Sequence, residues 1–475
     1  MQDGKKLSAD QLALGDMSPE EFRGAAHRVA DLAADYLDRL ESYDVLPKVE
    51  PGATRAKLPE APPASPEPLD GILADYRSIV EPYITHWQHP MFMAYFPSVA
   101  SGPGILGEWL AATLNSNVML WRNAPSSTEL EEVVVSWLRQ MLGLPPVFDG
   151  MFTDTASISS LLSIVAARHA AVGAEGGGRL RIYASTEAHS SIDKAAIVAG
   201  LGRSGVRRIP ADDDYRMRAD ALAAAIAEDR AAGWTPFCVV ATLGTTSSTS
   251  VDPCEAIAAI CRREKLWLHV DAAYAGAAAI VPELRPLLSG WEHADSIVVN
   301  PHKWMFTPFD ASLLLFRTPE AFRDAFSLVP EYLRTPEVGA AHNFNEYGIQ
   351  LGRRFRALKM WMQIRWFGVD GMAARLREHV RFAKLFASWV EADLEWELLA
   401  PVPFGTVCFR FRQGADLDAT NSMILDRVNA SGKIFLSHTK LKDRYTLRVA
   451  IGNPRQTEEH VARCWALLKE AAASV

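Results

Sequence analysis

Two buried strand patterns in the sequence end at residues that could carry out chemistry. The apolar, β-branched run from Ser296 to Asn300 stops at Pro301, which lacks the N–H that a strand needs, and Lys303 follows two residues later. The three residues from Trp304 to Phe306 are apolar. Little water is therefore available to solvate the ammonium group, and the pKa of Lys303 should be lowered. Such a lysine is suited to forming an imine with an aldehyde.

A carboxylate stands at the end of the second strand pattern. The run from Leu266 to Val270 leads directly into Asp271. In an open parallel sheet, ligands bind outside the carboxyl ends of the strands, and both Asp271 and Lys303 fall there. A lysine that holds an aldehyde and an acid that keeps a pyridine nitrogen protonated are the pair that pyridoxal phosphate (PLP) needs. The sequence therefore predicts PLP as a cofactor.

The residues around this pair also resemble a known family. The segments His269–Gly276 (His-Val-Asp-Ala-Ala-Tyr-Ala-Gly) and Asn300–Trp304 (Asn-Pro-His-Lys-Trp) are similar to the group II PLP-dependent decarboxylases, and among these to the aromatic-L-amino-acid decarboxylases. The resemblance extends over nearly all of residues 18–470. It implies decarboxylation of an aromatic L-amino acid to its amine, and a homodimer with shared active sites.

The helices and strands that would position Asp271 and Lys303 alternate along the chain. Helical stretches and short β-rich runs indicate an α/β domain with a mainly parallel sheet. The resemblance implies a PLP-dependent transferase of fold type I. We predict an N-terminal helical, dimer-forming segment with a proline-rich connector (1–95), a large PLP-binding α/β domain (96–370) and a smaller α+β C-terminal domain (371–475). The predicted strands of the large domain are Leu180–Ala184, Val206–Pro210, Phe237–Thr242, Leu266–Val270, Ser296–Asn300 and Ala311–Phe316.

The N-terminal segment begins with a helix signal. Ser18-Pro19-Glu20-Glu21 forms a capping box with proline at the first helical position, and apolar residues then recur at helical spacing. Between Pro47 and Pro68 the prolines are too dense for a helix or a central strand, which predicts an extended connector.

Thr155, Ala156 and Ser157 precede an apolar helix and could bind the phosphate of PLP with free N–H groups and hydroxyls. Hydroxyl residues begin most helices, so this pattern alone is weak, and the match to the family's Ser-Ala-Ser loop strengthens it. Two residues depart from the family pattern. Asp154 stands where the family usually has glycine, and Ile158 stands where it usually has glutamate. An acidic side chain beside a phosphate is repulsive unless it points away.

The family resemblance assigns further residues to the site. His189 matches a histidine that stacks on the pyridine ring, and Thr246 matches a cofactor-site threonine at a strand end. The predicted cofactor-binding residues are Lys303, Asp271, Ala273, His189, Thr155, Ala156, Ser157, Thr246, Asn300 and His302. The predicted substrate-binding residues are Trp87, Tyr95, Phe96, Pro97, Ser98, Asn117, Met119 and His189.

A polar segment with prolines and glycine, from Pro330 to Ala341, is typical of a mobile lid. The resemblance implies that this loop closes over the neighbouring subunit's site and that Tyr332 gives the proton to Cα after CO2 leaves. The predicted catalytic residues are thus Lys303, Tyr332, His189 and Asp271.

Composition excludes several other classes of protein. The 475 residues carry a net charge of −8 without a basic block, so we expect no nucleic acid partner. No apolar stretch reaches the roughly 18 residues that a membrane helix requires, and we expect a cytoplasmic protein without a membrane partner. The five cysteines are scattered, which favours reduced core thiols and no metal site.

Three alternative functions remain open at this stage. The fold could support oxidative deamination to an aromatic aldehyde, for which the family carries phenylalanine at the position of Tyr332. It could support decarboxylation of a non-aromatic amino acid such as histidine or glutamate. A catalytically silent PLP fold is the third alternative, which Lys303, Asp271 and His189 argue against. Asn117 and Met119 differ from the pocket residues of animal members, so the preferred ring stays open.

Overall fold

The computed structural model describes residues 16–328 and 341–474. They divide into two compact units, one ending at His89 and the other starting at Pro90. The division after residue 95 that the sequence analysis gives stays a prediction. The further division at residue 371 stays a prediction, and helix α12 (Ala357–Ala392) runs across it. At Gly368 this helix leaves helical geometry with a φ of 64°, so two helical stretches meet there.

The unit that ends at His89 is mainly helical. Helix α2 (Pro19–Asp38) starts with the predicted capping box, in which Ser18 and Glu21 bond each other's backbone N–H groups. The proline-rich stretch that follows contains a single short 3₁₀ turn, Arg55–Lys57, and helix α3 (Leu69–Asp75) comes after it.

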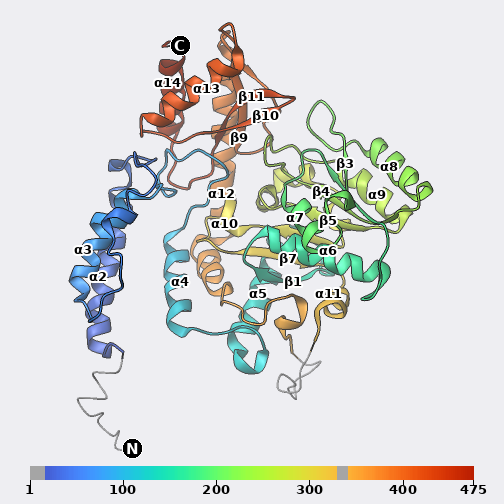
Figure 1. The fold of residues 1–475 in the computed structure, drawn as a ribbon, viewed down its shortest axis with the longest axis horizontal. Helices are drawn as coiled ribbons and strands as arrows, with labels where there is room; N and C mark the ends of the chain where they lie inside the picture. The colour runs from blue at the N-terminus through green and yellow to red at the C-terminus, as the bar shows by residue number, and fades with distance from the viewer. Residues whose placement is uncertain (1–15, 329–340, 475) are drawn as a thin grey trace, which may run out of the picture. The chain divides into compact units, whose positions relative to one another are not determined.

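A seven-stranded sheet organises the unit that starts at Pro90 (Figure 1). Its strand order is β1-β7-β6-β5-β4-β2-β3. The pairs from β3 to β6 are parallel, and β7 is antiparallel to both of its neighbours. The predicted mainly parallel sheet is confirmed. The strands are β1 (Asp149–Thr153), β2 (Leu180–Ser185), β3 (Val206–Ile209), β4 (Thr235–Thr242), β5 (Trp267–Asp271), β6 (Ser296–Val299) and β7 (Ser312–Phe316).

Helices cover both faces of this sheet because its strands are apolar on both sides. On β2 and β4, Ile182, Ala184 and Val240 pack with residues of α6 and α7. The intervening Tyr183 and Val239 pack with residues of α8 and α9. The helices that cover the sheet are α6 (Ala156–Val172), α7 (Ser191–Val198), α8 (Ala219–Ala231), α9 (Cys254–Glu264) and α11 (Pro319–Phe326). Helices α4 (Gly102–Leu114), α5 (Pro125–Met141) and α10 (Pro301–Trp304) complete this part of the chain.

The C-terminal residues form a smaller antiparallel sheet of order β10-β11-β9-β8, with two helices. This agrees with the predicted α+β arrangement. The strands are β8 (Trp396–Leu398), β9 (Thr406–Phe411), β10 (Ser437–Leu441) and β11 (Arg444–Ala450), and the helices are α13 (Leu417–Ala430) and α14 (Glu458–Ala472). Across the described ranges, no helix is long and apolar enough to cross a membrane.

Candidate active site

Lys303 lies in a cavity of about 220 Å³ at the carboxyl end of the parallel strands. It belongs to the short helix α10, which begins as soon as β6 ends at Val299. Eleven of the predicted site residues line this cavity. They are Phe96, Thr155, Ala156, Ser157, His189, Thr246, Asp271, Ala273, Asn300, His302 and Lys303.

Aromatic rings pack beside the Lys303 amine. Its Nζ lies 5.1 Å from the ring centroid of Phe96. Phe96 in turn stacks on Tyr274, with ring centroids 4.0 Å apart, and Tyr274 stacks on Trp304. Burial lowers the pKa of Lys303, while the charge of Asp271 opposes part of this effect. A larger fraction of the amine is therefore neutral and able to attack a carbonyl group.

Asp271 is the last residue of β5, and its side chain is 6% exposed. The backbone N–H of Ala273 donates a hydrogen bond of 3.1 Å to Asp271 Oδ1. This bond fixes one carboxylate oxygen and leaves the other able to accept a hydrogen bond from a protonated group in the cavity. An anion is thus held at the wall of the cavity that contains Lys303.

His189 shows a defined hydrogen-bond pattern at Nδ1. The backbone N–H of Ser191 donates to His189 Nδ1 over 3.1 Å, and Ser191 Oγ lies 2.9 Å from the same atom. Because Nδ1 accepts a backbone N–H, the neutral imidazole carries its proton on Nε2. Partial burial lowers the pKa of His189, which favours this neutral form.

The other end of the cavity has the features of a phosphate site. Thr155, the N-cap residue of α6, and the first two helical residues line it. Two further lining residues, Asn300 and Thr242, each have a buried side-chain oxygen without a hydrogen-bond partner among the described residues. Unpaired buried polar atoms are unfavourable, so these two atoms fit a polar ligand. The residues present are therefore consistent with PLP.

His302 has a structural partner on one side. Its Nδ1 accepts the backbone N–H of Ala311 over 3.0 Å, and its carbonyl oxygen accepts the Ser98 hydroxyl over 2.7 Å. Burial lowers the pKa of His302 to about 3, and the neighbouring Lys303 adds to this effect. His302 is thus neutral and presents its ring to the cavity.

Seven predicted residues are not part of this lining. Trp87 belongs to the unit that ends at His89, and Tyr332 lies outside the described residues. Tyr95, Pro97 and Ser98 flank Phe96 without lining the cavity, and Asn117 and Met119 are not among its lining residues either. Asn117 Oδ1 instead accepts the backbone N–H of Arg353 over 2.9 Å. The catalytic role of Tyr332 and the substrate roles of the other six residues stay predictions.

Sequence reasoning missed four lining residues: Ser191, Thr242, Gly244 and Tyr274. Thr242 ends β4, so its position at a strand end was a usable signal. Gly244 has a φ of 89°, and a Cβ there would lie 2.6 Å from the side chain of Ala275, so only glycine fits. Arg448 of β11 was also missed; it is 4% exposed and lies 4.6 Å from the centroid of Phe96.

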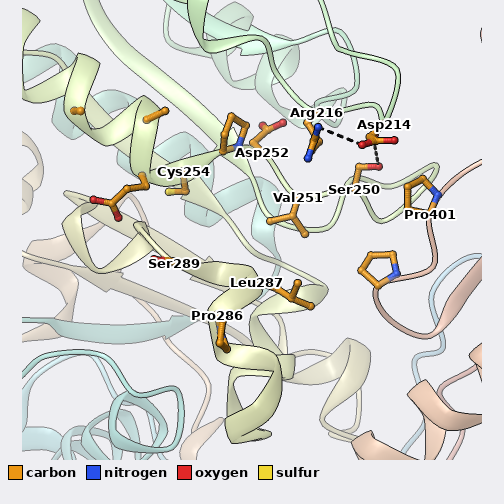
Figure 2. A pocket seen from close by; sticks show the side chains of 15 residues that line it. Asp214, Arg216, Ser250, Val251, Asp252, Cys254, Pro286, Leu287, Ser289 and Pro401 are labelled. Atoms are coloured by element: carbon orange, nitrogen blue, oxygen red, sulfur yellow. Dashed lines mark hydrogen bonds and ion pairs between the residues drawn. The ribbon is translucent and has the colours of Figure 1, made fainter.

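A second, larger cavity of about 730 Å³ lies beside the start of α9 (Figure 2). Its wall is mainly apolar, and Ser250 and Arg216 bond to Asp214 rather than to the open space. Of the described residues that line it, none is a lysine. This cavity therefore lacks the group that distinguishes the Lys303 cavity.

Comparisons with known proteins agree with this geometry. Residues 51–412 match the model of the pyridoxal-dependent decarboxylase conserved domain. The chain is 37% identical to an aromatic-L-amino-acid decarboxylase of Catharanthus roseus, over 98% of this chain and 97% of that one. It is 39% identical to a phenylacetaldehyde synthase of Arabidopsis thaliana, over 97% of both chains.

A solved structure is equally similar. The crystal structure of Oryza sativa TDC with PLP and tryptamine superimposes with a TM-score of 0.94, at 37% identity, over 97% of this chain and 99% of that one. A matching family model over most of the chain and full-length relatives at this identity lead to one conclusion. The chain belongs to the family of pyridoxal-dependent decarboxylases.

Proposed function

We propose that this protein removes the carboxyl group of an aromatic L-amino acid as CO2 and releases the corresponding amine, with PLP as its cofactor. The observation that carries the proposal is the meeting of Lys303, Asp271 and His189 in one cavity at the strand ends. The similarity to an aromatic-L-amino-acid decarboxylase supports the reaction and the substrate class.

The cofactor would be held at three points. Lys303 would bind its aldehyde carbon, Asp271 its pyridine nitrogen, and the segment Thr155–Ser157 with Asn300 its phosphate. When bound, PLP acts as an electron sink for the charge left at Cα when CO2 leaves. The anion of Asp271 strengthens this sink because it keeps the pyridine nitrogen protonated.

The protein's own groups set up the reaction. Burial lowers the pKa of Lys303, which increases the neutral fraction of the amine that can attack a carbonyl group. His189 lines the cavity and carries its proton on Nε2, so it could donate a hydrogen bond to a carboxylate or carbonyl oxygen of a bound substrate. Tyr332 would then supply a proton to Cα, a role that rests on the family resemblance.

We further propose a homodimer in which each site uses residues of both subunits. Leu106, Leu110 and Leu114 recur every four residues on α4 and are 52%, 48% and 65% exposed. Such a stripe on one helix face is costly in water and is typical of a surface covered by a partner. Asn117 and Met119 follow this helix and would reach the partner's cavity. The cytoplasmic location stays a prediction from the sequence.

A second candidate function is the oxidative production of an aromatic aldehyde. It is favoured by the similarity to a phenylacetaldehyde synthase, which matches the chain over the same length. Tyr332 argues against it, because the resemblance places phenylalanine there in aldehyde synthases.

The experiment that tests the proposal uses the purified enzyme with PLP and a panel of L-amino acids. Amine, aldehyde, ammonia and CO2 are measured together in each reaction. We expect amine and CO2 in equal amounts from at least one of tryptophan, tyrosine, DOPA and phenylalanine. Lys303→Ala should abolish both products, whereas the exposed Lys433→Ala should change neither. Aldehyde with ammonia as the main products, or activity on histidine or glutamate alone, would contradict the proposal.

A further inference from the structure

The indole of Trp304, the residue after Lys303, has a defined hydrogen-bond partner on another helix. Its Nε1–H donates to Nδ1 of His379 on α12 over 3.1 Å, and His379 Nε2 lies 3.2 Å from the backbone carbonyl oxygen of Asn453. An indole N–H can only donate, so Nδ1 accepts and the imidazole carries its proton on Nε2, which donates to Asn453. Burial lowers the pKa of His379 to about 4, so the ring is neutral at neutral pH. Both ring nitrogens are therefore in use, and the tautomer is fixed.

The same indole is one end of a stack of aromatic rings that reaches the Lys303 cavity. Trp304 stacks on Tyr274 with ring centroids 4.8 Å apart and planes 14° apart, and Tyr274 stacks on Phe96 at 4.0 Å and 13°. Tyr274 and Phe96 both line the cavity, and Lys303 Nζ lies 5.1 Å from the Phe96 centroid. Because the rings are nearly parallel and in contact, a tilt of the indole would shift the rings beside the reactive amine.

The helix that carries Lys303 and Trp304 depends on its surroundings for its orientation. Helix α10 has only four residues, about one turn, and a helix this short is not stable by itself. Trp304 is fully buried and His379 is 3% exposed, so little water can replace the hydrogen bond between them. Without its acceptor, the indole N–H would be left unpaired in the interior, at a free-energy cost that a rotation of the ring can relieve.

We propose that His379 is a positioning residue for Lys303. Its hydrogen bond to Trp304 holds the ring stack in the orientation that lets the Lys303 amine attack the cofactor aldehyde. His379 is not among the described residues that line the cavity, so it acts through Trp304. This inference rests on the proposed role of Lys303 in binding the cofactor.

Two substitutions separate the two hydrogen bonds of His379. The amide oxygen of asparagine can take the place of Nδ1, so His379→Asn keeps an acceptor for Trp304. The amide nitrogen of glutamine can take the place of Nε2, so His379→Gln keeps a donor for Asn453 and lacks the acceptor at Nδ1. Trp304→Phe keeps a ring for the stack and removes the indole N–H. The exposed His27→Gln serves as a control.

The measurement needs no amino acid. Apoenzyme is mixed with saturating PLP, and the rate at which the visible absorbance due to Lys303 appears is followed in variants whose thermal melts show a folded protein. We expect this rate to fall about tenfold in His379→Gln and in Trp304→Phe, and to stay within about threefold of wild type in His379→Asn. The control should match wild type.

A double variant shows whether His379 acts through the indole. With Trp304→Phe already present, His379→Gln should lower the rate by no more than about twofold, because the hydrogen bond is already lost. Equal rates in His379→Asn and His379→Gln, or a further tenfold loss in the double variant, would overturn the inference. A wild-type rate in Trp304→Phe would overturn it as well, even if the His379 variants did not fold.

The outcome also separates this inference from the proposed function. If the variants follow the expected order and Lys303→Ala abolishes the absorbance, the inference stands even if no L-amino acid is decarboxylated, and only the proposed function fails. If the wild-type protein makes amine and the variants do not follow this order, only the inference fails.

Discussion

The rate of the proposed reaction should depend strongly on one buried carboxylate, that of Asp271. Its side chain is almost fully enclosed and has one backbone donor, Ala273. We predict that Asp271→Asn lowers the rate of decarboxylation by about 10²–10⁴-fold, because an amide cannot keep a pyridine nitrogen protonated. The amide oxygen can still accept the Ala273 N–H, so the melting temperature should change by only a few degrees.

The rate of CO2 release and a thermal melt, both at saturating PLP, measure these two effects. A near wild-type rate in the folded variant would show that another group provides the anion. A large drop in melting temperature would instead point to a structural role for Asp271.

The product of the reaction depends on one proton. We predict that Tyr332→Phe shifts the product from amine to aldehyde, because phenylalanine keeps the ring but has no acidic hydroxyl. The unprotonated Cα then reacts with oxygen, and amino acid, O2 and water give aldehyde, CO2, ammonia and hydrogen peroxide. Simultaneous assays of amine and peroxide under air measure the shift. Tyr445→Phe serves as a control, since Tyr445 lies in β11, in the small sheet. Mainly amine from Tyr332→Phe at a wild-type rate would identify another donor, with His189 the first to test.

At the scale of elements, one ion-paired histidine fixes the chain where the described residues resume. His342 Nδ1 lies 2.7 Å from Glu132 Oε1 on α5, and Nε2 lies 3.3 Å from Asp149 Oδ2 on β1. Hydrogen bonds to Asp149 and Glu132 raise the pKa of His342 to about 10, against a usual value near 6.5. Because the folded-state pKa is the higher one, the stabilisation is complete below about pH 6.5 and is lost as the pH rises to about 10.

We therefore predict that His342→Gln destabilises the protein by about 1 kcal/mol near pH 6.5, a value that allows for the screening of a side chain that is 36% exposed. The difference from wild type should vanish near pH 10. Melting temperatures across this range test the prediction, with the exposed His27→Gln as a control. A difference that does not depend on pH would assign the effect to packing rather than to charge.

The sequence predicted the strands whose residues are mainly apolar. Three strands were predicted with bounds within one or two residues of the observed ones: Leu180–Ala184, Leu266–Val270 and Ser296–Asn300. Short runs of β-branched and apolar residues bounded by turn residues strongly favour a buried strand. Strand β1 was missed, since Asp149 and Gly150 begin it and its role as an edge strand is set by pairing with β7. Strand β10 alternates exposed and partly buried polar residues. Its own residues therefore did not predict a strand, which forms by pairing with β11.

The site was predictable where chemistry and strand ends coincide, as at Lys303 and Asp271. Ser191 was not predictable, because its bond to His189 depends on how the turn before α7 folds. The two bonds between Asp154 and Thr155 were not predictable either, although the acidic residue itself was noted as a departure from the family.

At the scale of the whole molecule, the proposed dimer gives a test that single variants cannot. We predict that Lys303→Ala subunits mixed with Tyr332→Phe subunits regain amine formation, because a hybrid dimer contains one site with both native groups. Random mixing should give roughly a quarter of the wild-type activity, since half of the dimers are hybrids and each has one intact site of two. The subunits must be exchanged before the assay, and exchange is verified with differently tagged chains.

In the control, Tyr332→Phe subunits are mixed with subunits that carry both Lys303→Ala and Tyr332→Phe. This mixture should regain no amine formation. If hybrid dimers form and still make no more amine than either parent, the segment that contains Tyr332 serves its own subunit.

The cavity around Lys303 is built from separate segments that range from Phe96 to Lys303 along the chain. Such contacts between distant residues close late in folding, since the chain between them must be ordered first. A growing polypeptide therefore has no complete site until Lys303 has left the ribosome. PLP that binds only the completed cavity raises the free energy of unfolding of the whole sheet. Resistance to proteolysis should therefore rise with PLP concentration.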